Sequence, residues 1–235
     1  KGNYILKNEQ ESARGILVSN NLKEMTKHIN EKKALGYPVD VVQKIIKSYL
    51  INGRAFKIRM FLLIKCDKKT KKKDFYLHNL GSIFYAPERY NPKKLSNNNV
   101  IANGYWYNFI HKTDYVSFVS DKPKTVHDLW KFFDNKNINS TNMMIKIQNL
   151  LKMIFKSVED KLYVKKINND QFCILGFDIM IDEYLKPWII EFNKGPSTKN
   201  YSDADVYNSK KKVSNASSIS RAIDDNASMS LPSYF

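Results

Sequence analysis

The hydrophobic pattern at the start of the chain predicts two short strands followed by a helix. Residues 3–7 (NYILK) and 15–19 (GILVS) are largely apolar and flank a polar turn, as two neighbouring strands do. Over residues 22–35, apolar side chains recur at helical spacing, and the sequence GYP at 36–38 ends the helix.

Further strands are predicted in the middle of the chain. Residues 39–46 (VDVVQKII) form an apolar run that predicts a buried strand, and residues 54–66 (RAFKIRMFLLIKC) predict a long one. A lysine-rich turn then leads to residues 75–78 (FYLH) and 82–85 (SIFY), which we interpret as further strands of a meander. Together these segments predict an α+β protein with mostly antiparallel sheets.

The rest of the chain alternates between loop-like and strongly patterned segments. Residues 86–115 are rich in Asn, Pro and Tyr and predict a long loop. Residues 143–162 predict an amphipathic helix, and we expect its residues Met143, Met144 and Met153 to lie in the core. The apolar face of this helix comprises Met144, Ile147, Leu151, Ile154, Phe155 and Val158.

Two predicted strands near residue 180 each carry a carboxylate in an apolar context. Asp178 lies in CILGFDIMI and Glu191 in PWIIEFN, with the short turn DEYLK between them. In a hairpin whose turn is centred between Tyr184 and Leu185, Asp178 and Glu191 face each other, and Asn193 shares the face of Glu191. Opposed carboxylates repel, and burying both is costly without compensation.

A divalent cation would supply that compensation. Mg²⁺ prefers oxygen ligands and is typically held by one or two carboxylates together with substrate phosphates. Asp178, Glu191 and Asn193 therefore form a candidate Mg²⁺ site. The alternative is that one of the carboxylates faces solvent or pairs with one of the many lysines.

Composition narrows the class of protein. The chain has 235 residues, of which 43% are hydrophobic, enough for one large domain or two associated lobes. The formal net charge of +16 implies attraction to a polyanion, such as nucleic acid, an acidic membrane surface, an acidic polypeptide or nucleotide phosphates. No apolar run reaches the length of a membrane span, which is about 18 residues. Cys66 and Cys173 have no zinc or disulfide spacing and are interpreted as reduced core thiols of an intracellular protein.

Residues 176–197 (GFDIMIDEYLKPWIIEFNKGPS) resemble the metal-binding end of the tubulin–tyrosine ligase and tubulin polyglutamylase family, which has the ATP-grasp fold. Other segments resemble the same family in the expected order, over roughly residues 4–197. They are YILK and RGILVS (a strand and a phosphate-covering loop), VVQKII (the adenine-binding hinge), GRAFKIRMFLLI (the substrate-facing strand) and GSIFYAPERY (the segment after it).

This resemblance implies an ATP- and Mg²⁺-dependent ligase that joins an amino acid to a protein carboxylate through an acyl phosphate. It implies two lobes of mostly antiparallel sheet with the nucleotide bound between them. The expected ligase-like domain covers residues 1–200, with a small lobe at about 1–45 and a large lobe at about 46–200. A polar tail follows over 201–235, and we expect the N-terminal region of the family to be missing.

The resemblance also assigns roles by position. It implies metal binding by Asp178, Glu191 and Asn193, and a catalytic role for Arg59, which would face the phosphoryl group or a substrate carboxylate. The residues implied to contact ATP are Lys7, Arg14, Gly15, Gln43, Lys44, Ile45 and Asn193. Because Lys44 lies in an otherwise apolar strand, we expect an acceptor near its ammonium. Asn103 matches an Asn that follows the central loop in the family.

Three positions depart from the family pattern. Ala55 replaces a Lys, Lys57 replaces an Asp, and Phe84 replaces an Arg that relatives usually carry. Lys57 is a candidate catalytic residue because it lies one alternation along the strand from the missing Lys. These departures motivate an alternative, a catalytically degenerate ATP-binding module that recognises an acidic partner.

The expected partners are an acidic protein acceptor, for example the C-terminal tail of tubulin, and a free amino acid. The positive charge suits such an acceptor, and the identity of the amino acid, glutamate or tyrosine, stays open. A nucleic-acid-binding function would rest on charge and aromatic content alone, because no recognition motif is present. We therefore expect a cytoplasmic monomer with no specific nucleic acid and no membrane as partner.

Overall fold

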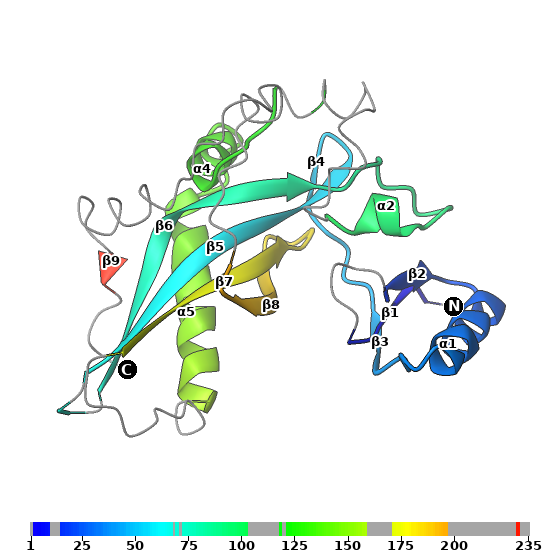
Figure 1. The fold of residues 1–235 in the computed structure, drawn as a ribbon. Coiled ribbons are helices and arrows are strands. Elements are labelled where there is room, and N and C mark those ends of the chain that lie inside the picture. The colour runs from blue at the N-terminus through cyan, green and yellow to red at the C-terminus, as the bar shows by residue number, and fades with distance from the viewer. Residues whose placement is uncertain are drawn as a thin grey trace, which may run out of the picture. The chain divides into compact units, whose positions relative to one another are not determined.

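The computed structural model describes residues 2–9, 15–67, 69–70, 72–102, 118, 121–158, 171–196 and, for the backbone alone, 229–230 (Figure 1). The chain divides into two compact units. The first comprises Lys1–Lys57, Phe84–Asp121 and Ile181–Tyr184, and the second comprises Ile58–Ile83, Lys122–Met180 and Leu185–Phe235. The proposed division into a small lobe and a large lobe stays a prediction.

A small antiparallel sheet and a helix begin the first unit. The elements are β1 (Tyr4–Lys7), β2 (Leu17–Ser19), α1 (Leu22–Ala34), β3 (Val41–Lys44), β4 (Leu50–Ile51) and α2 (Asn97–Val100). The strand order is β2-β1-β3, so β1 is central. Asn21 caps α1 by accepting a hydrogen bond from the N–H of Lys23, which satisfies a helical donor that otherwise has no partner. The two predicted strands and the predicted helix are thus confirmed.

The predicted burial of the third strand is wrong. β3 forms within residues 39–46, but all four of its residues are exposed, with Val41 at 46% and Val42 at 57% exposure. The reason is its place at the edge of the small sheet, where it pairs with β1 alone among the described residues. An apolar run by itself does not distinguish a central strand from an edge strand.

A larger sheet contains the long strands. The remaining elements are β5 (Arg54–Cys66), β6 (Lys73–Tyr85), α4 (Val126–Asp134), α5 (Ser140–Val158), β7 (Gln171–Ile181), β8 (Pro187–Lys194) and β9 (Met229–Ser230). The strand order is β8-β7-β5-β6-β9, and β4 also pairs with β5. The registers that are described in both sheets are all antiparallel, which confirms the predicted mixed class with antiparallel sheets. FYLH and SIFY lie in one continuous strand, β6, rather than in two.

The core of the second unit lies on one face of this sheet. Ile58, Met60 and Leu62 alternate along β5 and are fully buried. Met60 lies opposite Phe177 of β7, and Ile58 lies opposite Ile179, and both partners are fully buried as well. Since alternate side chains of a strand point to opposite faces, the other residues of β5 and β7 face away from this core.

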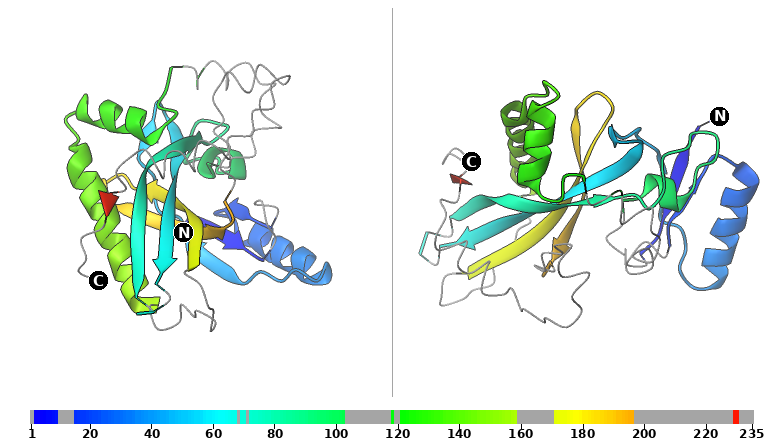
Figure 2. Two further views of the ribbon diagram at one scale, coloured as in Figure 1. Left: turned by 60° about the vertical axis from the view of Figure 1, so that its left-hand side comes forward. Right: turned by 90° about the horizontal axis from the view of Figure 1, so that it is seen from above.

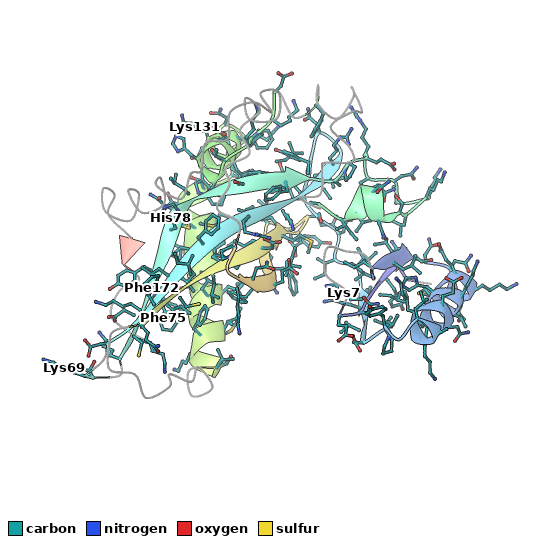
Figure 3. All side chains as sticks on the ribbon, in the orientation of Figure 1. Lys7, Lys69, Phe75, His78, Lys131 and Phe172 are labelled. Carbon is teal, nitrogen blue, oxygen red and sulfur yellow. The ribbon has the colours of Figure 1, made fainter. Side chains whose placement is uncertain are left out.

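Helix α5 packs on the apolar face of the sheet (Figures 1 and 2). Its buried residues Met143, Ile147, Leu151 and Phe155 are spaced by four positions, and so form one stripe along the helix. The ring of Phe155 lies 4.9 Å from that of Phe75 on β6 (labelled in Figure 3). The predicted amphipathic helix is therefore confirmed, with boundaries that differ by a few residues.

Two predictions of core residues are wrong in part. Met143 is buried, whereas Met153 is 63% exposed, because it lies two residues after Leu151 and so on the opposite side of the helix. Cys66 is a buried free thiol, but Cys173 is exposed; it lies near the start of β7, next to the exposed Phe172.

The long loop predicted at 86–115 is described up to residue 102, where it contains the short helix α2. In the tail predicted at 201–235, only β9 lies among the described residues, and its backbone pairs with Tyr76 and Leu77 of β6. Among the helices described, none is both long and apolar enough to span a lipid bilayer.

The stripe on α5 gives a direct test of this core. Leu151→Ala removes a fully buried side chain from the helix–sheet interface, and we expect it to lower the free energy of unfolding by about 3 kcal/mol. Met153→Ala, on the exposed side of the same helix, should change it by less than about 0.5 kcal/mol. Chemical denaturation measures both, and equal losses in the two variants would contradict the assigned helix face.

Candidate active site

Arg59 and Asp178 form an ion pair between two neighbouring strands of the larger sheet. Arg59 lies directly opposite Asp178 in the antiparallel register of β5 and β7. The guanidinium donates from Nε to Asp178 Oδ1 and from Nη2 to Asp178 Oδ2, the second contact measuring 3.0 Å. Both residues lie on the sheet face opposite to α5, because the alternate residues Met60 and Phe177 face the core.

Asp178 is fully buried, whereas the side chain of Arg59 keeps 19% exposure. The hydrogen bond from Arg59 to Asp178 raises the pKa of the guanidinium, against the opposing effect of burial. The charges of Asp178 and Glu191 raise this pKa further.

Glu191 and Asn193 lie on β8, the next strand beside β7. They are two positions apart, so they share one face of the strand, and Asn193 Nδ2 donates to Glu191 Oε1 at 3.3 Å. Glu191 and Asn193 thus lie on the strand next to the one that carries Asp178. The direct opposition of Asp178 and Glu191 stays a prediction.

Gly176 allows other groups to approach this face closely. A Cβ at this position would lie 2.7 Å from Pro196 Cβ and 3.3 Å from Arg59 Cδ. The side chain of Arg59 and the segment after β8 therefore pack over the bare backbone of β7. A larger residue here would displace one of the two.

The oxygen atoms of this cluster fit a hard cation in chemical type. Asp178, Glu191 and Asn193 offer two carboxylates and an amide, the ligands that Mg²⁺ prefers. Arg59 supplies one positive charge against two negative ones, so an added cation would balance the cluster. Among the described residues there is no group of three or more His, Cys, Asp or Glu side chains suited to a metal, so the amide of Asn193 is needed in such a set.

Lys57 precedes Arg59 on β5 and belongs to the first unit. Its ammonium lies 5.8 Å from the centre of the Phe84 ring, a cation–π distance. Phe84 thus contacts a cation, and its predicted replacement of an Arg of the family stays a prediction. Ala55 is buried and pairs with Leu50 of β4, where it serves packing.

Of the predicted phosphate-binding residues, Lys7 ends β1 and Gly15 lies two residues before β2 begins (Lys7 is labelled in Figure 3). Lys7 is half-buried at the end of β1. A Cβ on Gly15 would lie 1.4 Å from Asn8 Oδ1, so only a residue without a side chain fits against Asn8 as placed. Asn8 in turn donates from Nδ2 to the carbonyl of Tyr37 at 3.1 Å.

The predicted hinge residues lie at the end of β3. Gln43 and Lys44 are exposed, so the burial that called for an acceptor beside Lys44 is absent. The N–H of Ile45 donates to the carbonyl of Asn3 at 2.9 Å, and the predicted adenine contact of Ile45 stays a prediction. Arg14 and Asn103 lie outside the described residues.

One further contact, at the tip of the β7–β8 hairpin, was not predicted from the sequence. Glu183 N–H donates to the carbonyl of Lys47 at 3.0 Å, and the Lys47 ammonium donates to the Glu183 carboxylate. Tyr49 N–H donates to the carbonyl of Ile181 at 2.8 Å. The hairpin tip is thus joined to the segment that follows the predicted hinge. Lys47 and Glu183 are 136 positions apart in the sequence, and a local sequence pattern cannot predict a contact over that distance.

Comparison with known proteins defines the class. The chain belongs to the tubulin-tyrosine ligase family, whose model matches residues 3–217. It is 30% identical over 182 residues to the mouse protein named tubulin monoglutamylase TTLL4, covering 72% of this chain and 15% of that protein. It is 30% identical over 191 residues to a probable beta-tubulin polyglutamylase of Tetrahymena thermophila, covering 71% of this chain and 15% of the relative.

A third relative is the tubulin polyglutamylase ttll-4 of Caenorhabditis briggsae, 25% identical over 163 residues, which cover 66% of this chain and 27% of the relative. The chain therefore matches between 15% and 27% of the length of these three relatives. The expected family membership is confirmed.

Replacing Arg59 and replacing Asp178 should lower the free energy of unfolding by different amounts. Arg59→Met takes the guanidinium away from the buried Asp178 carboxylate, and we expect the free energy of unfolding to fall by about 3–5 kcal/mol. Asp178→Asn keeps an acceptor for the partly exposed guanidinium and should cost less. Lys65→Met, an exposed cation on the same face of β5, is the control. Chemical denaturation tests the pair, and a similar small loss for Arg59→Met and Lys65→Met would refute it.

Proposed function

We propose that this protein is an ATP- and Mg²⁺-dependent ligase of ATP-grasp fold that adds an amino acid to a protein carboxylate. The observation that carries the proposal is the cluster of Arg59, Asp178 and Glu191 on adjacent strands of one sheet. Membership of the tubulin-tyrosine ligase family supports it. In the proposed fold the nucleotide binds between two lobes.

The proposed reaction has two steps. A carboxylate oxygen of the acceptor attacks the γ-phosphorus of ATP, the bond to the β-phosphate oxygen breaks, and an acyl phosphate and ADP form. The amine of the incoming amino acid then attacks the acyl carbon, phosphate leaves, and the nitrogen loses a proton to give an amide. Positioning and charge stabilisation dominate such phosphoryl transfers.

Asp178, Glu191 and Asn193 would hold Mg²⁺. When bound, Mg²⁺ neutralises the triphosphate and the charge that develops during transfer. Arg59 orients Asp178 through its two hydrogen bonds and carries positive charge to the same face for the phosphoryl group or the acceptor carboxylate.

The proposed ATP contacts lie on the small sheet. Lys7 and Gly15 would serve the phosphates, and Gln43, Lys44 and the carbonyl of Ile45 would serve the adenine. Backbone N–H groups at a glycine-containing turn suit phosphate oxygens, because they concentrate positive dipole ends. The role of Arg14 is a further prediction of the same kind.

The proposed acceptor is the acidic tail of tubulin, and the proposed amino acid is glutamate. Two of the relatives described above are named polyglutamylases and one a monoglutamylase, all of tubulin. The net charge of +16 would speed encounter with an acidic peptide. A monomeric state and a cytoplasmic location are predictions that accompany this function.

Transfer of amino acids onto tubulin tests the function. The protein is incubated with ATP, Mg²⁺ and single amino acids over tubulin or acidic peptides, and products are read by mass spectrometry. We expect glutamate addition that stops on chelation of Mg²⁺. Asp178→Asn and Glu191→Gln should each lower the rate about a hundredfold or more, because a ligand for the cation is lost.

Glu183→Gln removes the same charge from the tip of the same hairpin and is the matched control, expected to keep most of the activity. Normal addition by both ligand variants would refute the assignment. ATP binding without transfer to any acidic acceptor would indicate the degenerate binding module instead.

Lys57 gives a separate test of the acceptor side. If its ammonium binds a substrate carboxylate, Lys57→Met should raise the KM for the acceptor peptide about tenfold with little effect on the KM for ATP. Lys65→Met, on the same face near the far end of β5, should change neither. Steady-state kinetics decide the matter, and equal changes in both KM values would exclude an acceptor role.

A further inference from the structure

The side chain of Asn97 bonds to the backbone of strand β2. Asn97 Nδ2 donates to the carbonyl of Ile16 at 2.7 Å, and its Oδ1 accepts from the N–H of Val18 at 2.9 Å. Both contacts are partly buried and join residues about 80 positions apart. Asn97 is the first residue of α2, and both the oxygen and the nitrogen of its side-chain amide bond to the strand segment.

These two bonds imitate a neighbouring strand. Among the strands that the structure describes, β2 pairs with β1 alone, through one of its edges. A carbonyl and an N–H two positions apart, on either side of Leu17, are the groups that one residue of a parallel neighbour would engage. The Asn97 amide therefore fixes the peptide planes on both sides of Leu17, at the edge that β1 leaves open.

The fixed segment begins one residue after Gly15. Gly15 packs against the side chain of Asn8, and Asn8 follows Lys7 at the end of β1. Leu6 lies opposite Leu17 in the β1–β2 register, so Lys7 at the end of β1 lies near Gly15, which precedes β2 by two residues. Gly15 is thus held from one side by Asn8 and, through Ile16, from the other by Asn97.

We propose that Asn97 is a positioning residue for nucleotide binding, which acts by holding the Gly15–Ile16 backbone where it meets the ATP phosphates. This inference rests on the proposed function and adds a residue to it. Asn97 itself need not touch the nucleotide. Its effect passes through the Ile16 carbonyl and the Val18 N–H.

Because of the strand order, we expect Asn97 to affect the contacts with the ATP phosphates and not those with the adenine. β2 and β3 lie on opposite sides of β1, so the proposed adenine contacts at Gln43, Lys44 and Ile45 lie across the sheet from Asn97. Loss of the Asn97 bonds should weaken binding of ATP and leave binding of adenosine nearly unchanged. A general loss of structure would weaken both ligands alike.

The experiment compares the two ligands in matched variants. Asn97→Ala removes both bonds, and Asn97→Asp removes the donor to Ile16 while keeping an acceptor for Val18. Asn98→Ala and Asn98→Asp are the controls, since Asn98 is the next residue of α2 and bonds to Glu88 instead of β2. Dissociation constants for Mg·ATP and adenosine are measured by competition with a fluorescent ATP analogue. Amide hydrogen exchange at Val18 reports on the strand directly.

We expect both Asn97 variants to raise the Kd for ATP about tenfold, equal to about 1.4 kcal/mol, with adenosine within about twofold. Exchange at Val18 should accelerate in Asn97→Ala, and the Asn98 variants should match the wild type. The Asn98→Asp control separates the loss of the bond from the effect of an added negative charge.

Several results would overturn the inference. They are an equal loss for ATP and adenosine, an unchanged ATP affinity in Asn97→Ala, or the same loss in the Asn98 controls. In each of these cases the wild type still binds ATP, so the proposed function stands. A wild-type protein that binds no ATP removes the proposed function itself, and this inference with it.

Discussion

The burial of Asp178 is the constraint on which the site depends. A carboxylate with no exposed surface is costly unless charged donors satisfy both oxygens, and Arg59 does so from the neighbouring strand. The pair also fixes how β5 and β7 align. A slip of one residue would turn Asp178 toward the helix α5 and the core, where no such donor is placed opposite. The register of the sheet and the chemistry of its open face are therefore set together.

The same pair explains how carboxylates persist on a sheet whose other face carries a buried apolar core. One guanidinium serves Asp178 directly and Glu191 by its charge. The balance is incomplete, because two negative charges meet one positive charge. The proposed Mg²⁺ would balance this excess, and Arg59 holds Asp178 through its own two hydrogen bonds.

Patterned segments of the sequence predicted most of the elements. The strands β5, β7 and β8 and the helix α5 have strong periodicity, and their existence and type are confirmed. Burial was predicted less well, as β3, Met153 and Cys173 show, because a local pattern does not reveal which side of an element a neighbour covers.

The sequence revealed candidate residues where a charged side chain interrupts an apolar strand, as Asp178 and Arg59 do. Their bonding to each other was not predicted, since nothing local links residues 119 positions apart. The same holds for Asn97, whose run of asparagines gave no hint of a partner in β2. Contacts of this kind depend on tertiary structure and become visible only in three dimensions.

β5 and β7 are neighbours in the sheet but lie far apart in the sequence, and this distance along the chain determines which part of the protein can form first. The small sheet pairs strands that all lie within the first 44 residues, so it closes over short loops. The pairing of β5 with β7 must wait for a chain segment more than a hundred residues further on, and distant pairings form slowly. During synthesis, the small sheet is therefore complete well before Asp178 and Glu191 have left the ribosome. Arg59 spends that interval without its partner, and the long strand β5 is exposed to mispairing until Asp178 arrives.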